Sequence, residues 1–283
     1  MLPEPSLKPI GVGDKWWIAG MTHSLAMAPT APRPQTIPAI DDDWMDLLSS
    51  AGWSWEFLRR NPTYLDAYAE YQRSRLHGRE RAALWGLRYF EDPALDAASA
   101  NVFWKMEVCR DVLPVQAVPA NQLGPGQPFP FEELDCRITV RNHVKETRKD
   151  VLFAKDGCFL QLAVFGECPL EKAALLTPVL ADRARSERQR EAMRRLEDLV
   201  RTGTMRHALY RQETRVRRLK NVLRALDGAL AKQPYREIAV AIFGAERVAQ
   251  EWTDPRDNLR DQVRRAVRCG KELMENGYRQ FVG

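Results

Sequence analysis

Five basic side chains follow one another at helical spacing near the C-terminal end of the sequence. They are Arg260, Arg264, Arg265, Arg268 and Lys271. At about 100° per residue four of them form one stripe with Arg265 beside it, opposite a side of apolar residues that includes Val263 and Val267. A guanidinium group can donate two parallel hydrogen bonds to a phosphate, or to O6 and N7 of guanine. The spacing therefore predicts a helix with one face for a core and the other for an anion.

Helix signals on either side define how this stripe is positioned. Asp254 and Pro255 supply an N-cap and a first helical residue, and Gly277 supplies a stop, so we expect a helix over 255–276. A shorter helix is expected from Pro234 to Gly244. The segment 245–252 between them carries one cation and two carboxylates, which is a poor composition for binding DNA. We therefore interpret this segment as a packed, extended turn.

Three further arginines complete the candidate DNA-binding set. Arg217 and Arg224 lie on the outward side of an amphipathic helix expected over 212–230, and Arg236 lies in the helix that opens at Pro234. Each of these arginines is equally compatible with a solvated helix face, so position alone does not decide their role.

The charge distribution favours the C-terminal part as the site of anion binding. The whole chain of 283 residues has a net charge of +5, but residues 1–181 carry −4 and residues 182–283 carry +9. A basic module of this kind is typical of proteins that bind polyanions.

The sequence also argues against several other functional classes. It contains no metalloprotease, P-loop or Ser/His/Asp motif, and the four histidines are spread along the chain without partners. The five cysteines include no C-x-x-C pair, so we expect reduced thiols, no metal and no cofactor. No apolar run reaches the length of a membrane span, and the N-terminal apolar run is interrupted, so we expect a cytoplasmic protein.

An aromatic-rich segment near the N-terminus needs a surface to pack against. Its rings include Trp53, Trp55, Tyr64 and Tyr68, and Asn61 before Pro62 is a strong helix start. About 35 residues cannot bury so much apolar surface among themselves. Docking within the chain is preferred to stacking on single-stranded nucleic acid, because several carboxylates lie among the rings.

The expected fold is mainly α, with a small antiparallel β-hairpin unit, a C-terminal extended-turn helix-turn-helix domain and a small N-terminal helical domain. The convincing strands are 137–140, 151–154 and 158–164, the last two joined by Lys155, Asp156 and Gly157. Helical signals return near Leu170. We divide the chain into a poorly ordered leader (1–40), the aromatic helical domain (41–76), a connecting region (77–135), the hairpin unit (136–185) and the basic domain (186–283).

Several segments resemble one family of regulators. The stretches NVLRALDGALAKQPYREIAVAIFGAERVAQEW (221–252) and LRDQVRRAVRCGKELMENGYRQF (259–281) resemble the extended-turn helix-turn-helix domain of regulators from proteobacterial integrative and conjugative elements. WEFLRRNPTYLDAY (55–68) resembles the N-terminal domain of their frameshifted excision activators, the FseA type. ALWGLRYFEDP (83–93) and VLFAKDGCFLQL (151–162) are similar to the intervening part.

The resemblance implies a sequence-specific activator of excision and transfer genes. Its basic side would include Arg260, Arg264, Arg265 and Arg268, and the opposite side would contact the N-terminal domain through Trp53, Trp55, Tyr64 and Tyr68. The implied partners are double-stranded promoter DNA, RNA polymerase and an antiactivator protein that binds the N-terminal domain. Related antiactivators of the QseM type resemble the C-terminal domain alone and carry a negative surface, from which this chain departs on both counts.

Two alternatives to a DNA-binding activator stay open at this point. One is an interaction protein that sequesters a homologous regulator without binding DNA. The other is an enzyme acting on nucleic acid, which no catalytic motif supports.

Overall fold

The computed structural model describes residues 43–119, 129–142, 147–166, 173–179, 186–210, 213–252 and 259–283. The expected leader and the expected helix start at 254–255 lie outside these residues. The N-terminal part consists of a 3-10 turn η2 (Asp43–Leu47) and the helices α1 (Ser50–Leu58), α2 (Pro62–Ser74) and α3 (Gly78–Ala83). The Asn61 side chain accepts hydrogen bonds from the backbone N–H groups of Thr63 and Tyr64, which confirms the expected cap.

Five strands form one mixed sheet in the middle of the chain. They are β1 (Leu113–Pro119), β2 (Arg137–Asn142), β3 (Arg148–Lys155), β4 (Cys158–Phe165) and β5 (Ala173–Pro178), in the order β2-β3-β4-β1-β5. β1 runs parallel to β4, and the other neighbours are antiparallel. The expectation of a small hairpin unit was therefore wrong. A short 3-10 turn, η4 (Phe131–Glu133), precedes β2.

The two strands missed in the sequence have weak local signals. β1 begins and ends among prolines, LPVQAVP, and β5, AALLTP, is rich in good helix formers. Both become strands because β1 is paired on both edges, with β4 and β5. Tertiary hydrogen bonding thus overrides local preference.

The β3–β4 hairpin is present where the sequence indicates it, with a tighter turn. Lys155 pairs with Cys158, so the connection has two residues rather than three. Asp156 and Gly157 have φ values of 47° and 76°. Positive φ at both central residues is the geometry of a type I′ turn, whose twist matches that of the flanking strands.

The C-terminal part is helical. It comprises α4 (Ser186–Thr202), the turn η7 (His207–Leu209), α5 (Val216–Leu230), α6 (Tyr235–Phe243), α7 (Ala245–Glu251), α8 (Leu259–Glu275) and the turn η8 (Gly277–Phe281). The expectation that 245–252 is an extended turn needs correction, because 245–251 form a helix. Gly244, at φ 89°, lets α7 begin at once, and the buried Val248 fixes α7 to the helices around it.

Three apolar cores hold these elements together. One joins the N-terminal aromatic residues to α5, the end of α8 and η8. A second lies between the sheet and α4, and the third lies among α5, α6, α7 and α8. The sheet is covered on both faces, since Leu162 belongs to the α4 core and its neighbour Ala163 to the aromatic core. This explains why β3 and β4 are buried almost continuously instead of in alternation.

Candidate nucleic-acid interface

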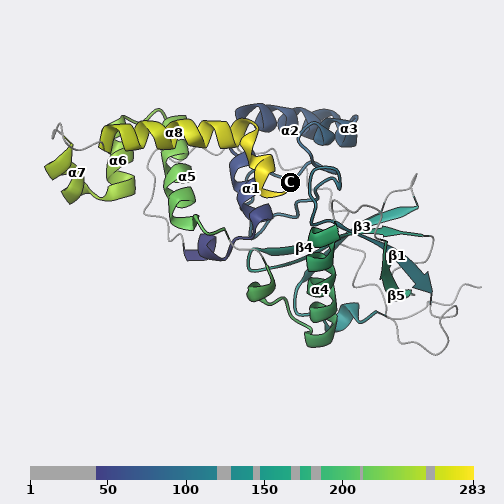
Figure 1. Cartoon of the computed structure of the whole chain (residues 1–283). Coiled ribbons are helices and arrows are strands. Elements are labelled where there is room, and N and C mark those ends of the chain that lie inside the picture. The colour runs from purple at the N-terminus through teal and green to yellow at the C-terminus, as the bar shows by residue number, and fades with distance from the viewer. Residues whose placement is uncertain are drawn as a thin grey trace, which may run out of the picture. The chain divides into compact units, whose positions relative to one another are not determined.

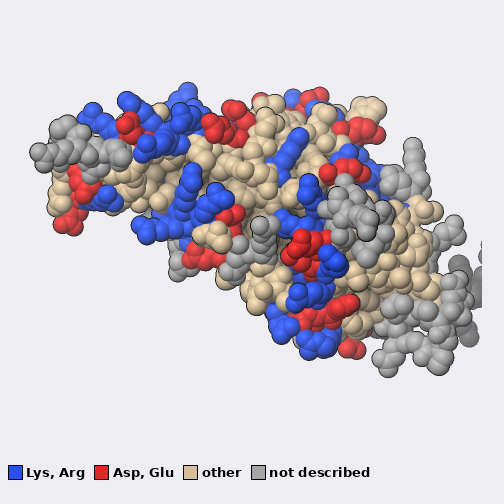
Figure 2. All heavy atoms as spheres, in the orientation of Figure 1, with Lys and Arg blue, Asp and Glu red and all other residues tan. Residues whose placement is uncertain are grey.

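Helix α8 separates its apolar and basic residues onto two sides. Leu259, Val263, Val267 and Leu273 are buried. The five predicted basic residues, Arg260, Arg264, Arg265, Arg268 and Lys271, are all exposed. Figure 2 shows Lys and Arg side chains gathered over α8, with a further group beside α5. The basic stripe predicted from spacing is therefore presented outward.

α8 is held at both ends by different cores. Val263 and Val267 pack with α6 and α7, whereas Leu273 and Met274 belong to the aromatic core. Figure 1 shows the helix running from α6 past α5 to α1. At Gly270 a Cβ atom would lie 2.9 Å from Leu226 Cβ of α5, so glycine permits the close approach of these two helices. The basic face is thus carried on a firmly anchored helix.

The basic side chains of α8 differ in their local contacts. Arg264 Nη1 lies 3.2 Å from Asp261 Oδ1, and the Arg260 guanidinium lies 5.2 Å from the centre of the Trp252 ring. Arg265, Arg268 and Lys271 make no hydrogen bond or ion pair with the residues that the structure describes. Three cations on this face are thus available to an anionic partner as they stand.

A groove of about 590 Å³ divides the predicted arginines into two groups. Arg265 of α8 and Arg217 of α5 line it, together with Arg215, Arg218 and the apolar Phe243. The other predicted α8 residues do not line this groove. Arg215 and Arg218 are therefore basic residues at this surface that the candidate set left out, although Arg218 lies on the flank of the basic side of the helix expected over 212–230.

The two remaining predicted arginines lie apart from the groove lining. Arg236 is exposed on α6, and Arg224 is partly buried on α5. Arg224 has a contact within the chain, so it is the less accessible of the two.

The N-terminal unit meets the C-terminal helices on the side away from the basic stripe. Phe57 and Phe281 stack with their ring centres 5.9 Å apart. Ser54 Oγ donates to the carbonyl of Tyr278 at 2.9 Å, and Asn61 Nδ2 donates to that of Met274 at 3.1 Å. These contacts place α1 against the end of α8 and η8.

The four aromatic residues predicted for this contact occupy different places. Trp53, Trp55 and Tyr64 are fully buried, and Tyr68 is partly buried beside them. Tyr64 packs edge-on to Trp55, so this ring pair belongs to the N-terminal unit itself. The residues that directly touch the C-terminal segment were not predicted from the sequence; they are Ser54, Phe57 and Asn61. A local pattern of aromatic residues does not show which side chains reach a segment far away in the chain.

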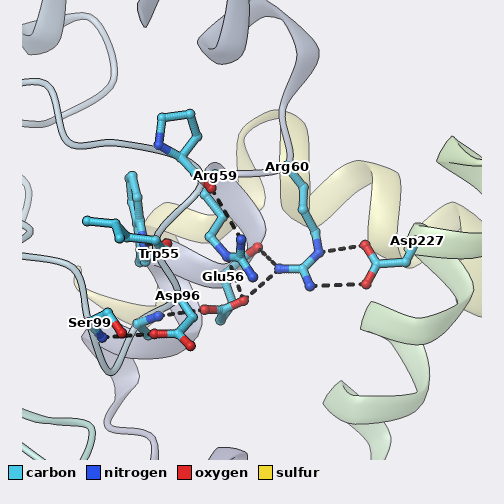
Figure 3. Close-up of polar contacts among 10 residues, drawn as sticks. Trp55, Glu56, Arg59, Arg60, Asp96, Ser99 and Asp227 are labelled. Carbon is cyan, nitrogen blue, oxygen red and sulfur yellow. Dashed lines mark hydrogen bonds and ion pairs between the residues drawn. The ribbon is translucent and has the colours of Figure 1, made fainter. Parts of the chain in front are cut away.

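A buried charge network also links the two parts (Figure 3). The Glu56 carboxylate, fully buried, accepts from Arg60 Nη1 at 2.6 Å, and Arg60 donates to both oxygens of Asp227 on α5 at 2.6 and 3.0 Å. Burial by itself lowers the pKa of Arg60. The charges and hydrogen bonds of Asp227 and Glu56 together raise this pKa by more, so the net shift is upward. Glu56 is one of the carboxylates that lie among the aromatic residues in the sequence, and its i, i+4 spacing to Arg60 was the available signal for this ion pair.

The described residues show no metal centre. No group of three or more His, Cys, Asp or Glu side chains in this part of the chain could hold a metal ion. His207 does have a partner, contrary to expectation, because its Nδ1 lies 3.2 Å from Cys158 Sγ. Burial raises the pKa of Cys158 to about 12, so this thiol stays protonated and is a poor nucleophile. Among the described helices, none combines the length and apolarity needed to cross a bilayer.

Comparison with known families agrees with this geometry. Residues 175–282 match the model described as T6SS transcription factor, DNA binding domain, which covers α4 to η8. Residues 40–90 match the model of a proteobacterial transcriptional regulator-like domain, which covers the aromatic unit. A search of curated proteins gave no match. Both matches indicate transcriptional regulation and the match over residues 175–282 adds DNA binding, so the chain is a DNA-binding transcriptional regulator.

Proposed function

We propose that this protein is a sequence-specific activator that binds double-stranded promoter DNA through the outer face of α8. The observation that carries the proposal is the set of exposed cations on α8, three of them without an ion pair to any described residue. We further propose that the genes it controls are excision and conjugative transfer genes on a mobile element. This part of the proposal rests on the family resemblance of the sequence.

The geometry suits both tasks that DNA recognition requires. A helix of 17 residues is about 25 Å long, which is sufficient to follow a major groove over several base pairs. Arg264 and Arg268 lie one turn apart near its middle, where we assign them to base edges or the nearest phosphates. Arg217, Arg218 and Arg265 around the groove are assigned to the sugar-phosphate backbone, which positions the protein without reading the sequence.

The test is a mobility-shift titration of the full chain on its promoter fragment at several salt concentrations. Arg264→Ala combined with Arg268→Ala should weaken specific binding by about tenfold to a thousandfold. If the two arginines bind phosphates instead, the slope of log affinity against log salt should become shallower by roughly 0.9 for each phosphate that the variant no longer neutralises.

A control variant separates this face from overall charge. Arg73→Ala combined with Arg190→Ala removes the same charge from exposed positions on α2 and α4. This control should change affinity less than the α8 variant. Equal losses of affinity in the two variants would show that net charge, not the α8 face, determines binding.

The interaction-protein alternative makes the opposite prediction in the same assay. A protein that only sequesters a homologous regulator would retain no DNA at low salt. The exposed and unpaired cations favour DNA binding, so we expect a shifted band and a steep loss of affinity with salt.

RNA polymerase and an antiactivator are the proposed protein partners. Transcription from the promoter with purified polymerase should rise when the regulator is added, and the absence of any rise would contradict activation. We further propose that the protein has no enzymatic activity, so a DNA substrate incubated with the protein and a divalent metal should remain intact.

A further inference from the structure

We propose that a small cavity at the junction of α1, the sheet and α4 binds a small carboxylic acid that carries a hydroxyl or amino group on the adjacent carbon. The cavity has a volume of about 30 Å³. Its walls come from three parts of the chain: the match over residues 40–90, the match over residues 175–282, and the segment between these two matches. This site is separate from the α8 face and does not depend on DNA binding.

Three polar atoms on the cavity wall lack a hydrogen bond. The hydroxyl groups of Ser49 and Tyr210, and Oδ1 of Asp111, are buried and make no hydrogen bond with the residues that the structure describes. Ser49 and Tyr210 are 7% and 6% exposed. A buried polar atom without a partner costs free energy, and three around one cavity indicate that something polar occupies it.

The position of Ser49 strengthens this interpretation. Ser49 is the N-cap residue of α1, where a serine hydroxyl ordinarily accepts from the backbone two or three residues on, but here it makes no such bond. Ser50 and Ala51, which start the helix, also line the cavity. The first N–H groups of a helix lack intrahelical partners and favour an anion.

The charged residues of the wall define the chemistry of the ligand. Arg195, only 4% exposed, lies with its guanidinium over the Tyr210 ring and 3.8 Å from Asp111 Oδ1. Arg188 Nη1 lies 3.5 Å from the same oxygen, so Asp111 Oδ1 has two ion pairs but no hydrogen bond. Burial raises the pKa of Tyr210, so its hydroxyl remains a donor. The wall thus offers several donors to a carboxylate and one carboxylate oxygen to a hydroxyl or ammonium group.

The size of the cavity limits the ligand. A water molecule needs about 10–15 Å³ on this scale, so the space holds two or three waters or, because bonded atoms lie closer together, an acid of about two carbons. Trp55, Trp104 and Phe159 form apolar parts of the wall, which leave no partner for a second charged group.

Isothermal titration of the full chain with glycolate, glycine and acetate tests the proposal, with tryptophan fluorescence as a second readout because Trp55 and Trp104 line the cavity. Glycolate or glycine should bind saturably. Acetate should bind at least about tenfold more weakly, since it leaves Asp111 without a donor. Absence of saturable binding of glycolate and glycine up to about 10 mM would overturn the proposal.

Variants locate the binding. Tyr210→Phe and Ser49→Ala should each weaken binding of the better acid by about tenfold, while Tyr235→Phe, a control at an exposed tyrosine, should leave it unchanged. Two independent variants keep the test decisive if one of them fails to fold. Unchanged affinity in the folded cavity variants, or a crystal structure grown with the acid that shows only water there, would refute the site.

Discussion

Replacing Glu56 by glutamine tests how strongly the N-terminal unit is held on the C-terminal helices. The buried carboxylate accepts from Arg59 Nε at 2.8 Å, from Arg60 Nη1 at 2.6 Å and from the backbone N–H of Ala97 at 2.7 Å. Glutamine keeps the shape and one acceptor oxygen. Its NH₂ group must face a donor, either the two guanidinium groups or the backbone N–H of Ala97, and in both orientations the negative charge that pairs with the arginines is lost.

The magnitude follows from the number and type of these bonds. Each charge-assisted hydrogen bond contributes about 1.5–3 kcal/mol, and breaking a buried ion pair costs about 3–5 kcal/mol. We therefore expect Glu56→Gln to lower the free energy of unfolding by about 3–5 kcal/mol. For a folded unit of this size the melting temperature should fall on the order of 10 °C.

Urea unfolding followed by circular dichroism measures this change, with thermal unfolding as a check. Glu107→Gln, at an exposed position, is the matched control and should stay within about 0.5 kcal/mol of the natural protein. Asp227→Asn should cost less, on the order of 1 kcal/mol, because Asp227 is partly exposed and Arg60 keeps Glu56. A loss below about 1 kcal/mol for Glu56→Gln would refute the reasoning.

Three further predictions concern the same framework. Asn61→Ala removes a helix cap and the bond to the Met274 carbonyl, so unfolding in urea should show a loss of about 1–2 kcal/mol; unchanged stability would contradict the cap. Gly270→Ala places a Cβ 2.9 Å from Leu226 Cβ, so we expect a loss of about 1–3 kcal/mol and weaker DNA retention, and neither should occur if the helices adjust freely. Burial raises the pKa of the Cys109 thiol from 9.0 to about 12, so its stabilising contribution is complete below pH 9 and is lost between these values as the unfolded chain releases its proton first. Cys109→Ala should flatten the decline in unfolding free energy across that range, and an unchanged slope would argue against the shift.

The elements that the sequence predicts well are those governed by local rules. The Asn61 cap, the β3–β4 hairpin (apart from the length of its turn) and the amphipathic helix α8 each depend on residues close in sequence. A cap needs two or three neighbouring N–H groups, a type I′ turn needs two positive φ values, and a helix face needs only a 3.6-residue period. The outward basic stripe of α8 therefore follows from the sequence alone.

Other features exist only because distant segments meet. β1 and β5 are strands since each completes the hydrogen bonding of the other, although their own residues favour loop or helix. The buried charge of Glu56 is paired with Arg60, which also binds Asp227, 167 positions away in the chain. No local sequence pattern shows a contact between residues so far apart, so the sequence alone does not reveal whether such a carboxylate is exposed or buried.

For the proposed DNA-binding face, the sequence by itself determined which residues are basic and that those of α8 share a helix. The tertiary structure decided how they divide, since packing of α5 against α8 at Gly270 brings Arg217 and Arg265 to one groove and leaves Arg264 and Arg268 outside it. The same is true of the cavity beside Ser49 and Tyr210. Its polar atoms come from segments that only long-range packing brings together. The physical reason is that the period of a helix or strand determines which residues share a face of that element, whereas contacts between elements determine which faces come together to form a site.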